Sequence, residues 1–189
     1  MLTIGITGTI GAGKGTIVEY LKTKGFKHYS AREVLLEEIG KRGMPPIRDS
    51  MLAIADEWRS TRAPSYIMEK LSEARTKDSG DAVIESQRAI GEIDFLRKNA
   101  AGFYLFAIDA DPKTRYERIF ARKSSTDNVT LEKFIEDEAK EMSNTEPWKT
   151  NLFACIKEAD FVFTNNGSFE ELQTQIDKVL SQISSQKSI

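Results

Sequence analysis

The chain has 189 residues, of which 40% are hydrophobic and 30% charged, and its formal net charge at pH 7 is −2. This length predicts one domain with a substantial core, and the balanced charge argues against a nucleic-acid or membrane-surface partner. A single cysteine excludes an internal disulfide framework and favours a reducing compartment. No apolar run reaches transmembrane length, so we expect a cytoplasmic protein.

Apolar, β-branched runs predict five strands, at residues 2–7, 26–29, 82–85, 103–108 and 160–164. Between them, apolar residues recur at helical spacing over 17–21, 34–39, 51–58, 66–71, 112–119 and 168–183. Strands that alternate with helices predict a five-stranded parallel sheet with helices on both faces. Such sheets bind ligands at the carboxyl ends of their strands. We expect one domain over 1–183 and a flexible tail over 184–189.

The segment after the first strand has the pattern Gly8-x-x-x-x-Gly13-Lys14-Gly15-Thr16 and opens a helix, which is the context of a phosphate-binding loop. Glycines allow backbone angles that point successive N–H groups at an anion. The helix N-terminus and the Lys14 ammonium add positive charge. The pattern therefore predicts that the loop holds ATP phosphates and that Lys14 acts in catalysis; the loop residues are Gly8, Gly11, Ala12, Gly13, Lys14, Gly15 and Thr16.

Gly15 stands where the commonest phosphate loop has Ser or Thr, so no hydroxyl at this position can bind Mg²⁺ directly. Thr16, one position later, can instead donate to a phosphate oxygen. The sequence Gly-Lys-Gly-Thr resembles the loop of adenylate kinases and other nucleoside monophosphate kinases. This resemblance implies a P-loop kinase architecture of the adenylate-kinase type. It also implies that Mg²⁺ accompanies ATP and is held by phosphates and water.

Two later segments carry the same resemblance. "DPKTRYERIFARK", 111–123, resembles the helix that leads into the lid of these kinases, which implies a short lid at about 123–130. Arg118 and Arg122 lie four residues apart, on one helix face, and are the implied catalytic arginines; Arg118 is also implied to bind ATP. "ADFVFTNNGSFEEL", 159–172, resembles the last strand and the loop near the adenine, which places three residues beside the base: Asn165, Asn166 and Gly167.

The chain also resembles a group of adenylate-kinase-like proteins whose relatives include P-loop segments joined to deoxycytidylate deaminases. "IRDS", "PSYI", "AVIES", "DADPKTRYERI" and "TNNGS" carry this similarity. It implies small-molecule nucleotides as substrates and a nucleotide deaminase as an associated protein. One His and one Cys cannot supply a zinc-deaminase site, so the deaminase domain would lie elsewhere.

A kinase needs an acceptor site opposite the phosphate loop. Arg32, Arg48 and Arg88 are candidates for a clamp on an acceptor phosphate, because a guanidinium matches phosphate oxygens in pairs; Arg88 is also a candidate catalytic residue. Ser30 ends the second strand beside them. Glu85 closes the third strand, where a buried carboxylate needs a cation or a metal-bound water. Its two open interpretations are a contact with Mg²⁺-bound water and an ion pair with Arg88.

Three functions remain open from the sequence. A (deoxy)nucleoside monophosphate kinase leads, because an ionised phosphate attacks without a base. Dephospho-coenzyme A kinase, or another small-molecule hydroxyl kinase, needs a base; the stretch from His28 to Arg32 has no Asp, and Glu33 is the only carboxylate nearby. A regulatory nucleotide-binding module with weak ATPase activity is the third, because "ESQR" and the glycine-free lid depart from well-known kinases.

Overall fold

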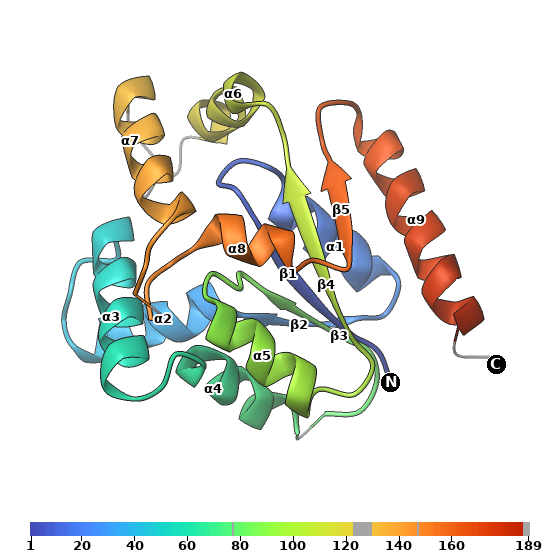
Figure 1. Ribbon diagram of the computed structural model, residues 1–189, viewed down its shortest axis with the longest axis horizontal. Coiled ribbons are helices and arrows are strands. Elements are labelled where there is room, and N and C mark those ends of the chain that lie inside the picture. Colours follow the sequence, from blue (N-terminus) through green and yellow to red (C-terminus); the bar gives the residue numbers. More distant parts are fainter. Residues whose placement is uncertain (77, 123–129, 147, 187–189) are drawn as a thin grey trace.

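The computed structural model describes residues 1–76, 78–122, 130–146 and 148–186, with the side chain of Arg122 outside the description. Five strands form one all-parallel sheet in the order β2-β3-β1-β4-β5 (Figure 1). They are β1 (Thr3–Gly8), β2 (Lys27–Ser30), β3 (Ala82–Glu85), β4 (Phe103–Asp109) and β5 (Phe161–Thr164). The predicted five-stranded parallel sheet is therefore confirmed.

Helices lie on both faces of this sheet, as predicted (Figure 1). Helices α1 (Lys14–Thr23) and α9 (Phe169–Gln186) cover one face, and α4 (Tyr66–Arg75), α5 (Ile90–Asn99) and α8 (Leu152–Lys157) cover the other. Helices α2 (Ala31–Lys41), α3 (Arg48–Thr61), α6 (Pro112–Arg122) and α7 (Leu131–Met142) lie around the carboxyl ends of the strands (Figure 1). In the described chain, no helix is long and apolar enough to cross a membrane.

The two faces are buried by alternate residues of each strand. Ile4 and Ile6 of β1 and Phe106 of β4 pack with the apolar side of α1 and α9. On the other face, Ile84 of β3 packs against α4, and Leu105 of β4 packs against α5 and α8. This period of two follows from the pleat of a strand, and burial on both faces explains why the strands read as nearly continuous apolar runs.

Among the described residues, the structure adds three helices that the sequence did not predict: α5, α7 and α8. Helix α7 follows Thr130, whose side chain accepts from the N–H of Lys133, and α8 has only six residues. Helix α9 extends to Gln186, so 184–186 are helical and the prediction of a tail beginning at 184 is wrong there. The buried Ile183 continues the apolar side of α9 into its last turn. Residues 123–129 of the lid predicted at about 123–130, and residues 187–189, lie outside the described residues.

Candidate active site

The phosphate loop runs from the end of β1 into α1. Gly8, Gly11 and Gly13 have positive φ angles of 139°, 78° and 109°, which glycine adopts without the steric cost that a Cβ brings. At Gly8 the neighbouring strand adds a second requirement, because a Cβ would lie 2.0 Å from the carbonyl oxygen of Ile108. The loop therefore needs glycine where it leaves the sheet.

Lys14, the first residue of α1, turns back under this loop. Its Nζ donates to the carbonyl oxygens of Gly8 at 2.7 Å and Thr9 at 2.8 Å. Burial of the ammonium, and next the charge of Arg88, lower the pKa of Lys14 to about 7. Because this pKa lies near neutral pH, part of the Lys14 population is unprotonated, and a bound anion favours the protonated, charged form. Such a group is suited to binding phosphates.

The loop after β5 braces the phosphate loop. The Asn165 side chain donates to the carbonyl oxygen of Ala12 at 2.8 Å, and the backbone carbonyl oxygen of Asn165 accepts from Arg118 Nη1 at 2.9 Å. Asn165 is buried, whereas the Asn166 side chain accepts from the N–H of Asp111. The predicted base-binding residues Asn165, Asn166 and Gly167 do not line the cavity described next, so their contact with a base stays a prediction.

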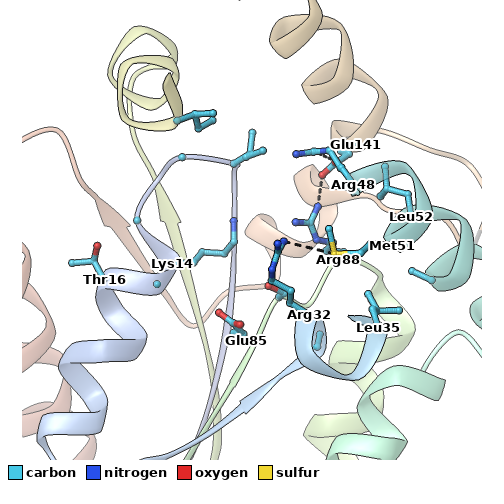
Figure 2. A pocket seen from close by; sticks show the side chains of 18 of the residues that line it. Lys14, Thr16, Arg32, Leu35, Arg48, Met51, Leu52, Glu85, Arg88 and Glu141 are labelled. Carbon is cyan, nitrogen blue, oxygen red and sulfur yellow. Dashed lines mark hydrogen bonds and ion pairs between the residues drawn. The ribbon is translucent and has the colours of Figure 1, made fainter. Parts of the chain in front are cut away.

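A cavity of about 860 Å³ extends from the phosphate loop toward α2 and α3. Of the residues predicted from the sequence, ten line it: Gly11, Gly13, Lys14, Gly15, Thr16, Arg32, Arg48, Glu85, Arg88 and Arg118. Figure 2 shows Lys14 and Thr16 on one side of it, and Arg32, Arg48 and Arg88 across from them. Gly8, Ala12 and Ser30 are buried and do not line the cavity. The predicted role of Arg122 rests on a side chain outside the described part of the chain.

Sequence reasoning missed the apolar wall of the cavity and one acidic residue. Leu35 of α2 and Met51, Leu52 and Ala55 of α3 form the wall. The acidic residue is Glu141 of α7, whose two carboxylate oxygens accept from Arg48 and Arg88 (Figure 2). The apolar spacing of 51–58 predicts a helix but not which side of it lines a cavity, and no motif in the sequence marks Glu141.

The Glu141 carboxylate is enclosed, with its side chain 8% exposed. Burial alone would raise its pKa, but the charges of Arg88 and Arg48 hold the pKa of Glu141 below its usual range. The described contact of the Arg32 guanidinium is different: it donates to the thioether sulfur of Met51 at 3.7 Å. Of the three candidate clamp arginines, two are therefore bound to one carboxylate, while Arg32 contacts a weak acceptor.

Arg88 is positioned by a buried ion pair behind it. Glu92 of α5 accepts from the backbone N–H of Arg88 at 2.7 Å, and its other oxygen accepts from Arg59 Nε at 2.9 Å. The side chains of Glu92 and Arg59 are 0% and 3% exposed. Between β3 and this pair, Ser86 has a φ of 73°, which is uncommon for a residue other than glycine. This turn and the Glu92 carboxylate together direct Arg88 into the cavity.

Glu85 lies at the floor of the cavity, at the end of β3. It accepts from Ser30 Oγ at 2.8 Å, and the His28 Nε2 atom lies 3.4 Å away. Burial raises its pKa, but the nearby His28 and the hydrogen bond from Ser30 outweigh this and leave the pKa of Glu85 below its usual value. Ser30 also accepts from the N–H of Glu33 at the start of α2. Ser30, predicted to bind the acceptor, is instead a buried residue that orients Glu85 and caps α2.

Comparison with known proteins places this site in a family. Residues 4–149 match the AAA domain model AAA_18. The chain is 30% identical to UPF0200 protein MJ1399 of Methanocaldococcus jannaschii over 187 residues, covering 97% of this chain and 91% of the relative. It is 28% identical to UPF0200 protein PH1008 of Pyrococcus horikoshii, covering 94% of this chain and 95% of the relative.

Solved structures show the same fold at low identity. TT1252 from Thermus thermophilus aligns with a TM-score of 0.63 at 20% identity, covering 96% of this chain and 97% of that one. A gluconokinase from Sinorhizobium meliloti aligns with a TM-score of 0.59 at 14% identity, covering 99% of this chain and 95% of that one. Shikimate kinase from Bacteroides thetaiotaomicron aligns with a TM-score of 0.57 at 9% identity, covering 97% of this chain and 98% of that one. The sheet and its helices thus have the P-loop kinase fold, and the chain belongs to the AAA_18 domain family and, with its archaeal relatives, to the UPF0200 family.

Proposed function

We propose that the protein is an ATP-dependent nucleoside monophosphate kinase, which transfers the γ-phosphoryl group of ATP to a (deoxy)nucleoside monophosphate. The charge of the cavity opposite the phosphate loop carries this proposal. Arg32, Arg48 and Arg88 line this part of the cavity, together with the acidic Glu85 and Glu141. Over the whole lining, basic residues outnumber acidic ones, because Lys14, Arg59 and Arg118 join the three arginines and only Glu19 joins the two carboxylates. This positive excess suits a phosphate monoester, which carries about −1.5 to −2 at pH 7.

The apolar wall supports the same acceptor. Met51 and Leu52 of α3 and Leu35 of α2 face the cavity beside the arginines (Figure 2). A nucleotide has a flat, weakly polar base next to a charged phosphate, and this half of the cavity offers a surface for each. The acceptor phosphate is already ionised, so positioning and charge neutralisation suffice for its attack.

The donor side follows from the loop. Backbone N–H groups of the phosphate loop and Lys14 would hold the β- and γ-phosphates of ATP, and Arg118 and Arg122 would act on the transferred group. Mg²⁺ would be held by phosphates and water. Glu85, an ionised carboxylate in the cavity wall, suits a contact with such a water. A nucleotide deaminase as an associated protein stays a prediction from the sequence resemblance.

A hydroxyl kinase is the second candidate, and Glu85 is the residue that favours it. A hydroxyl acceptor must lose a proton, and Glu85 lies in the cavity wall, whereas Glu33 is exposed and outside the lining. The candidate base from the sequence is thus replaced by Glu85. Its low pKa makes it a weak base, which leaves the monophosphate kinase as the better-supported proposal.

The decisive assay supplies MgATP with separate acceptors and follows both ADP release and the phosphorylated product. The acceptors are the ribo- and deoxyribonucleoside 5′-monophosphates, dephospho-coenzyme A, shikimate and gluconate. We expect a nucleoside diphosphate as product. Phosphorylation of the hydroxyl compounds alone would refute the proposal, and ATP hydrolysis without transfer would favour the regulatory module.

Two variants and a control assign the acceptor site in the same assay. Losing a charged hydrogen-bond partner costs about 1.5–3 kcal/mol, so Arg32→Ala and Arg88→Ala should lower kcat/KM for the acceptor roughly ten- to hundredfold. Both should spare MgATP binding. Arg62→Ala, an exposed arginine outside the cavity, should change neither. Full loss of activity in Glu85→Gln, with both arginine variants active, would indicate a hydroxyl acceptor.

A further inference from the structure

The inference concerns Glu141, and it rests on the proposed function. In Figure 2 the Glu141 carboxylate lies between Arg48 of α3 and Arg88 after β3, with one oxygen bound to each guanidinium. Two bridging oxygens on two arginines are also the arrangement in which a phosphate group is bound by an arginine clamp. Glu141 thus holds the two arginines in the manner expected of an acceptor's phosphate.

A phosphate and the Glu141 carboxylate cannot both occupy this position. Both are negative, and the Glu141 side chain is only 8% exposed, so solvent screens their repulsion poorly. The cavity otherwise offers Arg32, whose described contact is the Met51 sulfur, as a further cation for the incoming anion. A dianionic phosphate therefore gains more from the three arginines than a single carboxylate does.

Helix α7 is attached in a way that permits this exchange. Its buried side chains are Phe134 and Glu141, while the rest of its surface is partly or fully exposed. Phe134 packs near Tyr116 of α6, at 5.7 Å between ring centroids, and Glu138 pairs with Arg115 of the same helix. The carboxyl end of α7 also contacts α8 and is hydrogen-bonded to the segment before it through Asn144. The Glu141 side chain takes part in none of these contacts, so its carboxylate can leave the clamp while α7 stays in place.

We infer that Glu141 is a specificity-determining residue: its carboxylate occupies the clamp of Arg48 and Arg88 as an internal competitor, which a phosphorylated acceptor displaces. An acceptor with two negative charges displaces Glu141, whereas a neutral hydroxyl compound has no charge with which to do so. The residue therefore selects phosphate monoesters and keeps the arginines paired in the protein without acceptor.

The test measures binding by calorimetry, with MgADP filling the phosphate loop and the 5′-monophosphates of adenosine, cytidine, guanosine, uridine and thymidine titrated one at a time. Glu141→Gln removes the competing charge and keeps the size. An internal competitor divides the apparent affinity by the reciprocal of the fraction of protein whose clamp is free. With about one tenth of the protein free, we expect Glu141→Gln to bind the preferred monophosphate about tenfold more tightly. The matched control is Glu136→Gln, an exposed residue of the same helix paired with Lys140, which should bind as the parent does.

Weaker or unchanged binding in Glu141→Gln would overturn the inference, because it would make Glu141 a positioning residue for the arginines. Glu141→Asp is a second variant in case Glu141→Gln does not fold. It keeps the negative charge but shortens the side chain by one methylene, so it should tighten binding by less than Glu141→Gln does. If Glu141→Gln binds a monophosphate more tightly but no phosphoryl group is transferred, the proposed kinase activity is refuted and the role of Glu141 as a competitor is supported. If a monophosphate is phosphorylated but Glu141→Gln binds it more weakly, the kinase activity is supported and the competitor role is refuted. If no variant binds a monophosphate, both proposals are refuted.

Discussion

Asn165 donates from its side-chain amide to the carbonyl oxygen of Ala12 at 2.8 Å, which ties the loop after β5 to the phosphate loop. The two residues lie 153 positions apart in the chain, and both are buried. A Cβ at the adjacent Gly13 would lie 2.4 Å from the same amide nitrogen. One asparagine thus supports the phosphate loop from behind, and Arg118 binds its carbonyl from the cavity side.

The first prediction follows from this contact. In Asn165→Asp the side chain keeps its size, but an ionised carboxylate cannot donate to Ala12 and repels its carbonyl oxygen. A buried acceptor left without its donor costs about 1–3 kcal/mol, and we expect the midpoint of urea unfolding to fall accordingly. MgATP binding, measured by calorimetry, should weaken as well, because the loop loses its brace. Unchanged ATP affinity in a destabilised Asn165→Asp would show that the contact serves stability alone.

Two glycines of the same loop should respond to alanine in opposite directions. Gly8 has a φ of 139°, and a Cβ there would collide with the carbonyl oxygen of Ile108, whereas a Cβ at Gly15 would meet no described atom within 4 Å. Gly8→Ala should lose at least about 1–3 kcal/mol of unfolding free energy from backbone strain. Gly15→Ala, within α1, should gain up to about 1 kcal/mol from helix propensity. Urea denaturation measures both, and equal losses at the two positions would contradict the described loop geometry.

The lowered pKa of Lys14 predicts proton uptake on nucleotide binding. With a pKa of about 7 in the protein without nucleotide, Lys14 is mostly neutral at pH 8 and mostly charged at pH 6. Nearby phosphates favour the charged form and raise this pKa. MgATP binding should therefore take up close to one proton at pH 8 and almost none at pH 6. Calorimetry in buffers of different ionisation enthalpy measures this uptake.

Lys14→Met is the control for that experiment. It keeps an unbranched apolar chain and removes the titrating group, so the proton uptake at pH 8 should vanish. Phosphoryl transfer should also be lost, because the Lys14 charge has no replacement in the loop. Uptake that persists in a folded Lys14→Met protein would assign the proton to another group.

The buried pair of Arg59 and Glu92 should dominate the stability of the region behind Arg88. Glu92→Gln leaves the Arg59 guanidinium, 3% exposed, without its buried countercharge. Breaking a buried ion pair by removing one partner costs about 3–5 kcal/mol, whereas replacing both partners by apolar residues is often far less costly. We therefore expect a large loss of unfolding free energy in Glu92→Gln and a smaller loss in Arg59→Met/Glu92→Leu, both measured by urea denaturation. A larger loss in the double variant would contradict this account.

The local pattern of the sequence was sufficient for the sheet and the phosphate loop. Five apolar runs correspond to the five strands, because burial on both faces of a parallel sheet makes each strand apolar along its length. The helical spacing between them corresponds to α1, α2, α3, α4, α6 and α9. Gly8, Gly11, Gly13 and Lys14 form the predicted loop, since the backbone angles and charge that a phosphate needs are encoded within a few consecutive residues.

Tertiary structure decided which distant side chains meet. Arg48, Arg88 and Glu141 come from α3, the turn after β3 and α7, and no local pattern relates their positions. No local pattern predicts the hydrogen bond from Asn165 to Ala12 either. Nor does one predict that the Ser30 hydroxyl donates to Glu85 instead of lining the cavity. Helix propensity and apolar spacing report burial along one element, whereas the charge balance of a cavity depends on which elements the fold brings to one edge of the sheet.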